Sequence, residues 1–201
     1  MSELFSIQLQ NRQQQGRDGV WLDLPTTTEQ VQAALRQIGI SSDNPQGLFI
    51  SGYFAEEEKR FAISYNMVLA SNVDELNFLA SRLETLSTGE RAELNAALQA
   101  PQSELFSIGR ITDFPENVDY YVHLPDVHGP AQLGDYYLNR SGMVNMPEEW
   151  KGGIDTAQFG RYVAQQEQGA FTQYGYLVKS GDEWQKVHAV SYTHLRAHET
   201  R

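Results

Sequence analysis

The stretch that decides the fold of the C-terminal part is GIDTAQFGRYVAQQEQGAFTQYGYLV, residues 153–178. Asp155 is a favourable N-cap, and Gln158 stands three residues later, where its side chain can bond back to the cap. Gly169 is placed to end the helix in a left-handed conformation. The pattern therefore predicts one helix between Asp155 and Gly169.

Apolar residues flank this helix and continue beyond it. Ile154 precedes the cap and Phe159 follows four residues after it, so the two side chains can form a hydrophobic staple. Residues 170–178 (AFTQYGYLV) are rich in aromatic residues and predict a single strand. The stretch is therefore expected to be one helix followed by one strand.

Spaced residues in this stretch carry a resemblance. They are an Ile-Asp pair, an aromatic-Gly-Arg triplet, a Gly-Ala-Phe-Thr run and a Tyr-Gly-Tyr run, and their key members are Ile154, Asp155, Phe159, Gly160, Arg161, Gly169, Phe171, Gly175 and Tyr176. This pattern resembles the C-terminal signature of the ArdA antirestriction family. Residues 19–25 (GVWLDLP) and 74–80 (DELNFLA) agree more loosely, so the resemblance covers most of residues 3–178. The family usually has Ile-Asp-Tyr-Glu-x-Tyr-Gly-Arg, whereas this chain has Thr156, Ala157 and Phe159, which removes one acid.

The resemblance implies an inhibitor without catalytic activity. Members of the family are encoded on mobile elements, imitate bent B-form DNA and occupy the DNA site of type I restriction-modification enzymes. It implies no cofactor and binding to a protein groove in place of nucleic acid. No metal is expected, because the sequence lacks a complete ligand set, and no membrane, because no apolar run is long enough. The resemblance also implies a homodimer formed through the C-terminal part, which is rich in aromatic residues that can cover more than one core: Tyr136, Tyr137, Phe159, Tyr162, Phe171, Tyr174 and Tyr176.

The composition favours a protein with a large surface. The chain has 201 residues, 40% of them hydrophobic, and a mean hydropathy of −0.49. It has no cysteine, which excludes disulfides, zinc-thiolate sites and thiol catalysis and fits a cytoplasmic protein. No apolar run reaches membrane length and no signal peptide opens the chain. The net charge of −11, from 26 acids and 15 bases, repels nucleic acid and steers the chain toward a basic partner.

Acids are spread singly along the predicted helices. Residues 71–155 contain fourteen acids and five bases, a net charge of −9. Rigid helices can hold carboxylates at fixed positions, as imitation of a duplex with one charge per ~1.7 Å requires. A solvated acidic surface is the simpler interpretation, and an acidic interaction module of a mobile element with a different target is the alternative function. The predicted partner-binding acids are Asp74, Glu75, Glu84, Glu90, Glu93, Glu104, Asp113, Glu116, Asp119, Asp135, Glu148 and Glu149.

The order of patterns predicts an elongated α+β protein in three parts. Residues 1–68 form a small α/β unit, residues 69–115 a bundle of short helices, and residues 116–189 an α+β unit with about three strands. In the first part, strands are expected over residues 3–10, 19–24 and 47–54. A helix with a capping box at residues 26–29 lies between the last two strands, and its apolar face is Val31, Ala34, Leu35 and Ile38.

The other two parts have their own start and stop signals. Ser71 and Ser87 are expected to cap two helices, and Ser103 to begin a third. After Pro115, a strand is expected over residues 118–124, a helix opens at Gly129-Pro130, and a last strand covers residues 183–189.

Motifs that carry chemistry are few. His123, Asp126 and His128 form one group that can hold a metal ion, and a small metal-dependent enzyme centred on them is a minority hypothesis. No further ligand is evident, and Pro125 indicates an irregular loop. The sequence has no G-x-S-x-G elbow, no P-loop and no G-x-G-x-x-G.

The last twelve residues do not resemble a natural protein sequence. Residues 190–201 (VSYTHLRAHETR) resemble the in-frame translation of a sequencing adapter. His194 and His198 lie four residues apart in this segment, and we therefore do not count them as metal ligands. We expect this tail to pack on nothing, and the genuine sequence to be cut near Ala189.

Overall fold

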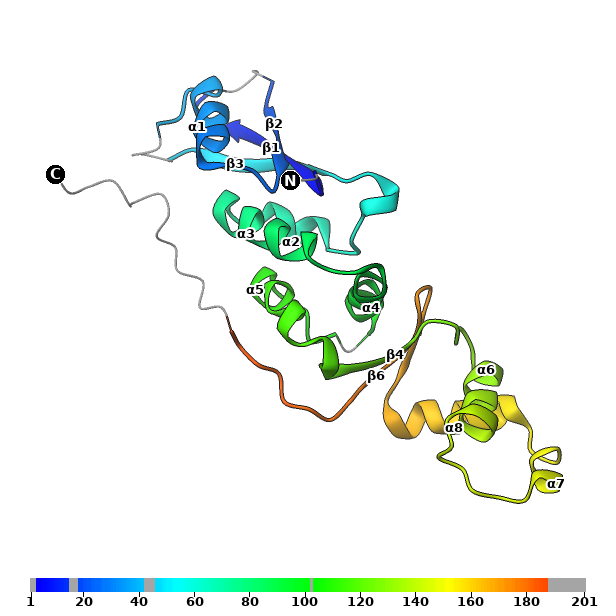
Figure 1. Cartoon of the computed structure of the whole chain (residues 1–201). Helices are drawn as coiled ribbons and strands as arrows, with labels where there is room; N and C mark the ends of the chain where they lie inside the picture. Colours follow the sequence, from blue (N-terminus) through cyan, green and yellow to red (C-terminus); the bar gives the residue numbers. More distant parts are fainter. Residues whose placement is uncertain (1–2, 15–17, 42–45, 102, 188–201) are drawn as a thin grey trace. The chain divides into compact units, whose positions relative to one another are not determined.

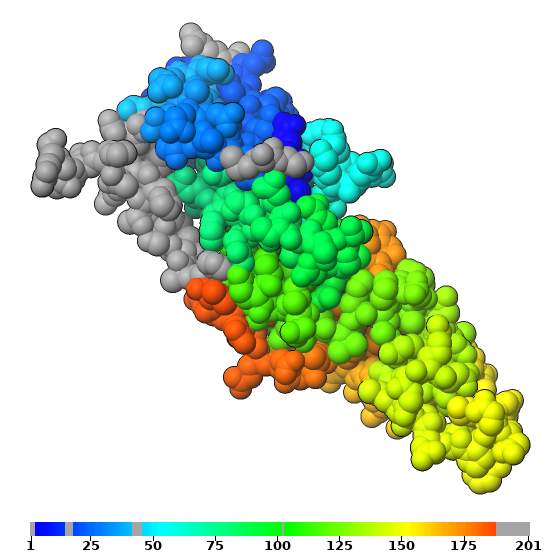
Figure 2. All heavy atoms as spheres, viewed as in Figure 1, coloured from blue at the N-terminus to red at the C-terminus, as the bar shows by residue number. Residues whose placement is uncertain are grey.

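A computed structural model of the chain describes residues 3–14, 18–41, 46–101 and 103–187 (Figures 1 and 2). The expected tail, with His194 and His198, lies outside the described residues. The fold is α+β, with two small antiparallel sheets among short helices, as predicted. Contacts divide the chain into two compact units. The first unit contains the described residues up to Leu86, Leu105–Pro115, and residues 186–187, and the second contains Ser87–Glu104 and Glu116–Gln185.

The first unit is built on a three-stranded sheet with the order β2-β1-β3. Its strands are β1 (Phe5–Asn11), β2 (Val20–Leu24) and β3 (Leu48–Phe54). Residues alternate between the two faces, so that Ile7 and Leu24 are buried while Trp21 and Asp23 point outward. This confirms the predicted strands.

Helix α1 (Thr28–Gln37) covers the buried face of this sheet with Val31, Ala34 and Leu35. Its capping box uses Thr27 and Gln30. The box expected at residues 26–29 is therefore shifted by one residue. The shift follows from three consecutive threonines, since any of them can serve as N-cap.

The rest of the first unit is helical. After the 3₁₀ turn η1 (Glu57–Lys59) come α2 (Tyr65–Leu69), α3 (Val73–Glu84) and α5 (Ile108–Thr112). The buried face of α3 is the predicted one, Val73, Leu76, Leu79, Ala80 and Leu83, but its N-cap is Asn72 in place of Ser71. The helix expected from Ser103 begins only at Ile108, because the side chain of Ser107 serves as its N-cap and accepts the hydrogen bond of the Arg110 amide. Phe106, just before this cap, is 67% exposed.

The second unit begins with α4 (Thr88–Gln99), whose capping box joins Ser87 and Glu90 as predicted. The 3₁₀ turn η2 (Phe114–Glu116) begins in the first unit and ends in the second, and η3 (Val118–Tyr120) then leads into β4 (Tyr121–Leu124). Then come α6 (Pro130–Asp135), the π-helical η4 (Tyr136–Arg140), α7 (Glu148–Lys151) and α8 (Thr156–Glu167). Strands β5 (Ala170–Thr172) and β6 (Gly175–Lys179) complete a sheet of order β4-β6-β5.

The prediction of a single strand over residues 170–178 is wrong, because the chain turns back between β5 and β6. The Thr172 hydroxyl donates to the Gly175 carbonyl (2.9 Å) and accepts from the Tyr174 amide (3.1 Å). Gly175 has φ +118, a conformation that side chains rarely allow. The hairpin supplies two of the three strands expected in this part.

The last strand, expected over residues 183–189, is absent from the part of it that the structure describes, residues 183–187. The Asn117 side chain donates to the Gln185 carbonyl (2.9 Å) and accepts from the Gln185 amide (2.7 Å). These are the backbone groups that a strand would use for pairing. One side chain therefore takes the place of a neighbouring strand.

The three-part division stays a prediction. Helices of the expected middle part belong to both compact units, with α3 and α5 in the first and α4 in the second. Among the residues that the structure describes, no helix is both long and apolar enough to cross a membrane.

Helices α6 and α8 touch backbone to backbone, and glycine makes this possible (Figure 1). A Cβ atom on Gly134 would lie 1.9 Å from the carbonyl oxygen of Thr156, and one on Gly160 would lie 1.8 Å from that of Pro130. Neither neighbour is a flexible side chain that can move aside. Both positions therefore exclude every residue except glycine at this crossing.

We expect Gly160→Ala to destabilise the second unit by about 3 kcal/mol or more, since the added methyl group overlaps backbone atoms. The matched control is Gly89→Ala in α4, where nothing lies within 4 Å of the added Cβ. The control variant should be as stable as the wild type or slightly more stable, because alanine has a higher helix propensity than glycine. Urea unfolding followed by far-UV circular dichroism measures both changes. Equal stability of the two variants would contradict the crossing.

Candidate functional site

The C-terminal signature begins and ends α8. The Asp155 carboxylate accepts the hydrogen bond of the Gln158 amide at 2.9 Å, which confirms the predicted N-cap. At the other end, the left-handed residue is Gln168, with φ 56, and the prediction that Gly169 takes this conformation is wrong. Gly169 is required for a different reason.

Gly169 leaves room for a buried tyrosine. A Cβ atom at this position would lie 1.9 Å from the Tyr176 hydroxyl oxygen. The Tyr176 side chain is fully buried, and its ring lies 4.9 Å from the ring of Phe171, centroid to centroid. Three signature residues therefore meet at one point of the core.

A carboxylate that sequence reasoning missed lies at the centre of this cluster. Glu167 accepts a hydrogen bond from the Tyr137 hydroxyl (2.5 Å) and another from the Tyr176 hydroxyl (3.0 Å). Burial, and then the interactions with Glu167, raise the pKa of each tyrosine well above the ordinary value for tyrosine. Both hydroxyls therefore keep their protons and remain hydrogen-bond donors. One signal was available in the sequence: an acid in the last turn of a helix opposes the helix dipole and needs a compensating partner.

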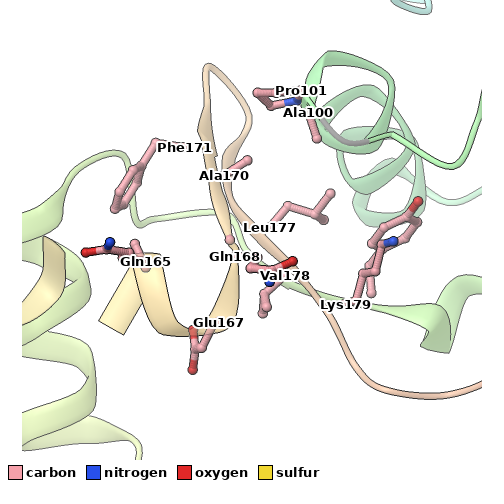
Figure 3. Close-up of a pocket in the computed structure, with 13 residues that line it drawn as sticks. Ala100, Pro101, Gln165, Glu167, Gln168, Ala170, Phe171, Leu177, Val178 and Lys179 are labelled. Carbon is pink, nitrogen blue, oxygen red and sulfur yellow. The ribbon is translucent and has the colours of Figure 1, made fainter. Parts of the chain in front are cut away.

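A hollow of about 420 Å³ lies beside this cluster, within the second unit (Figure 3). Its wall combines the apolar side chains of Phe171, Leu177 and Val178 with Glu167 and Lys179. The Glu167 carboxylate is engaged by the two tyrosines, and the Lys179 ammonium bonds to Glu104 at 2.7 Å, which raises the pKa of Lys179. Glu167 and Lys179 therefore serve structure in this wall.

The remaining signature residues divide into structural and exposed positions. A Cβ on Gly175 would lie 2.4 Å from the Leu124 carbonyl oxygen, so this glycine is needed for close approach of β4 and β6. Ile154 and Phe159 are half-buried, whereas Arg161 points to solvent. Most of the signature thus specifies packing in the second unit.

A model of the family described as antirestriction protein (ArdA) matches residues 15–178. The chain belongs to the ArdA antirestriction protein family. The match spans most of the chain and contains the whole signature, which confirms the resemblance seen in the sequence. A search of the curated proteins gave no match.

The charge of this ArdA family member is concentrated in the second unit. That unit contains thirteen acids and five bases, a net charge of −8, out of −11 for the chain. Among the predicted partner-binding acids, Asp74, Glu75, Glu84 and Asp113 belong to the first unit, and the other eight to the second. Four of those eight are exposed: Glu116, Asp119, Glu148 and Glu149.

Asp113 departs from the expected surface. Its side chain is 2% exposed, at the C-cap of α5 beside the fully buried Ile111 and Phe114. A carboxylate at this depth cannot reach a partner protein. We therefore leave Asp113 out of the proposed surface.

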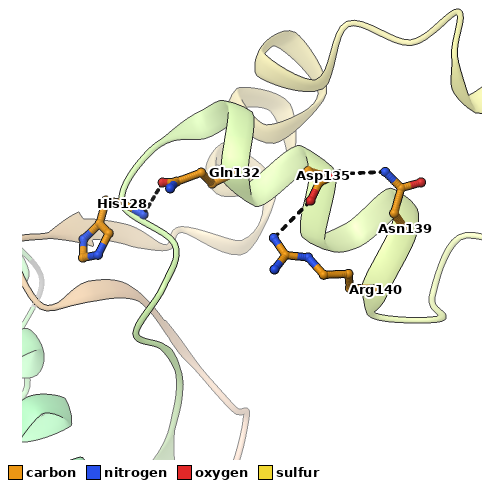
Figure 4. A network of polar contacts seen from close by, with 5 residues as sticks. All are labelled: His128, Gln132, Asp135, Asn139 and Arg140. Atoms are coloured by element: carbon orange, nitrogen blue, oxygen red, sulfur yellow. Dashed lines mark hydrogen bonds and ion pairs between the residues drawn. The ribbon is translucent and has the colours of Figure 1, made fainter.

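Three of the acids in the second unit are paired within it. Asp135 accepts from Arg140 (3.0 Å) and from Asn139 (2.8 Å), as Figure 4 shows, and Glu148 pairs with Lys151 at 2.9 Å. The third is Glu104, held by Lys179. These pairs fix carboxylates in place, but exposed pairs of this kind contribute little to stability.

Glu93 differs from the other acids because burial suppresses its charge. Its Oε1 atom is buried without a hydrogen-bond partner. Burial, together with the nearby carboxylates of Glu90 and Asp119, raises the pKa of Glu93 to about 7. At neutral pH this acid therefore supplies only part of a negative charge.

The histidine group does not assemble around an ion. The Nε2 atom of His123 donates to the Tyr174 carbonyl at 2.7 Å and so ties β4 to the hairpin turn. The His128 backbone amide donates to Gln132 (Figure 4). Across the described residues, no group of three or more His, Asp or Glu side chains is arranged to hold a metal ion.

We expect Tyr176→Phe to reduce the free energy of unfolding of the second unit by about 1.5–3 kcal/mol, since the Glu167 carboxylate loses the hydrogen bond that the Tyr176 hydroxyl donates. Tyr162→Phe on α8 is the control, because the Tyr162 side chain is 60% exposed. It should change stability by less than about 0.5 kcal/mol. Denaturant unfolding measures both, and a stable Tyr176→Phe would contradict the role of Glu167.

We expect Glu93→Gln to make the protein more stable than the wild type at pH 8. The folded pKa of about 7 lies above the ordinary 4.5, so the folded state binds more protons than the unfolded state between these values. The contribution of Glu93 to the free energy of unfolding is therefore complete below pH 4.5 and is lost as the pH rises toward 7. The gain should be about 1 kcal/mol, less than the shift alone implies, because water screens this half-buried carboxylate.

The control for this experiment is Glu149→Gln, at an exposed carboxylate. Thermal unfolding of the three proteins between pH 4.5 and 8 separates them. The Glu149→Gln variant should follow the wild type over the whole range. A Glu93→Gln variant that also follows the wild type would show that this carboxylate is ionised in the folded protein without cost.

Proposed function

We propose that the protein inhibits type I restriction-modification enzymes by imitating DNA and occupying their DNA-binding groove. It would act stoichiometrically, without cofactor or catalysis, in the cytoplasm, and would protect an incoming mobile element. Family membership supports an antirestriction role. The observation that carries the mechanism is the net charge of −8 in the second unit, with acids held on helices and turns.

The physical basis is competition for the same cations. A groove that binds duplex DNA is lined with lysine and arginine side chains that neutralise phosphates. Exposed carboxylates at Glu116, Asp119, Glu148 and Glu149 can bind the same side chains. Because each contact is partly screened by water, no single acid should dominate.

We also propose a homodimer formed through the second unit. Its aromatic residues divide into two groups. Tyr176 is buried in the unit's own core and Phe171 packs against it, whereas Tyr162 and Trp150 are 60% and 68% exposed. Exposed aromatic side chains are typical of interfaces. An acidic module that binds a protein other than a restriction enzyme is the alternative, and it would leave type I enzymes uninhibited.

The test is protection of unmodified DNA from a type I nuclease. We expect full-chain wild type to protect, and a variant that combines Glu116→Gln, Asp119→Asn, Glu148→Gln and Glu149→Gln to lose most of this protection. Glu149→Gln alone should change inhibition less than about fivefold, as expected for one screened pair of at most ~1 kcal/mol.

A control variant removes acids from the first unit instead. The variant Glu56→Gln, Glu57→Gln, Glu58→Gln loses three exposed carboxylates around η1. It should protect DNA as well as the wild type does. Undiminished protection by the four-acid variant, with its fold intact by circular dichroism, would show that these acids are only a solvated surface.

A further inference from the structure

The outward face of the sheet in the first unit carries exposed aromatic side chains. Trp21 on β2 is 50% exposed and Phe54 on β3 is 58% exposed. The strand register places Trp21 and Gly52 on either side of Gln8, the residue between them on β1. The Trp21 ring reaches across β1, with its Cη2 atom 3.0 Å from where a Cβ of Gly52 would stand. Gly52 therefore lets the indole lie over the sheet.

Carboxylates stand beside these rings. Ser6 pairs with Asp23 on one side and with Phe54 on the other, and its hydroxyl donates to Asp23 at 2.7 Å. Asp23 follows Trp21 by two residues on the same strand, so the two side chains point to the same face about 7 Å apart. Asp23 therefore has the Trp21 side chain beside it along β2, and the Phe54 ring stands on the other side of Ser6, on β3.

Further acids make this corner of the sheet negative. A small hollow next to Phe54 is lined by Glu3, Glu56 and Lys59, and Lys59 is already paired with Glu56 at 2.9 Å. The Glu3 carboxyl bonds to Asp23, which raises the pKa of Glu3 and lowers that of Asp23. When both are ionised they repel each other, and a bridging cation relieves that repulsion.

The combination of aromatic rings and carboxylates favours arginine as the side chain that binds this surface. A guanidinium is planar, stacks on aromatic faces and bonds a carboxylate with two parallel N–H groups. A lysine ammonium carries the same charge but has no planar group that can stack on a ring. Single-stranded nucleic acid also stacks on aromatic side chains, but its phosphates would approach Asp23, Glu3 and Glu56. Charge complementarity therefore favours a protein segment.

We propose that this face of the first unit, formed by Trp21, Asp23 and Phe54, is a docking surface for an arginine-bearing segment of a protein partner. The guanidinium stacks on Trp21 or Phe54 and bonds to Asp23. This surface uses residues of the first unit and none of the acids of the second unit, so the proposal is independent of the DNA mimicry proposed above.

The test uses the ¹⁵N-labelled full chain and two peptides of equal charge, octa-arginine and octa-lysine. The indole N–H signal of Trp21, assigned with Trp21→Phe, should shift with octa-arginine. Octa-arginine should bind about two- to fivefold more tightly than octa-lysine at physiological salt, as expected for stacking at an exposed site. This preference should disappear in Trp21→Ala, Phe54→Ala and persist in Phe78→Ala, whose side chain is 45% exposed on α3.

Charge is unchanged in all these variants, so general attraction to an acidic protein cannot explain the expected difference. If the double variant does not fold, Phe54→Ser carries the test, because that side chain is mostly exposed, and Asp23→Asn tests the carboxylate. Equal affinity for both peptides, or an arginine preference that survives loss of the rings, would overturn the proposal. So would a Trp21 signal that moves with a ten-nucleotide thymidine strand and not with octa-arginine.

Discussion

The direct backbone contact between α6 and α8 is the constraint on which the second unit depends. It exists because Gly134 and Gly160 have no side chain where the two helices cross. The crossing fixes the direction in which α8 leaves Asp155 and where its last turn ends. The hairpin that follows must then return beneath that turn, and Gly169 is the position that lets Tyr176 enter. A single steric requirement thus connects residues scattered through the signature.

The Glu167 carboxylate completes this arrangement electrostatically. Its two oxygens are each bonded by a tyrosine, one from η4 and one from β6, so one acid joins three elements of the unit. A partly buried carboxylate without such donors would lose hydration that nothing replaces. The same unit also contains most of the net charge of the chain, carried on helices and turns. Specific packing and a negative surface are therefore properties of one structural unit, and this connects the family signature to the proposed function.

Local signals in the sequence predicted most elements, and tertiary contacts decided the rest. The caps at Asp155 and Ser87 and the buried faces of α1 and α3 follow from side chain type and spacing alone. The turn between β5 and β6 was not predicted, because its side-chain bonds through Thr172 are invisible to a pattern that reads AFTQYGYLV as continuously β-prone. The absence of a strand over residues 183–187 depends on Asn117, 68 residues away from Gln185. Acidic positions were found easily, but the burial of Asp113 and Glu93 depends on packing that composition does not report.

The central claim is that this ArdA family protein and duplex DNA compete for one groove. The most direct measurement is fluorescence anisotropy of a labelled duplex bound to a type I enzyme, titrated with the full chain at several salt concentrations. The account predicts complete displacement of the duplex, with an apparent affinity that weakens as salt rises, since carboxylates replace phosphates on the same cationic side chains. A ternary complex in which the enzyme keeps the duplex while binding the protein would contradict it.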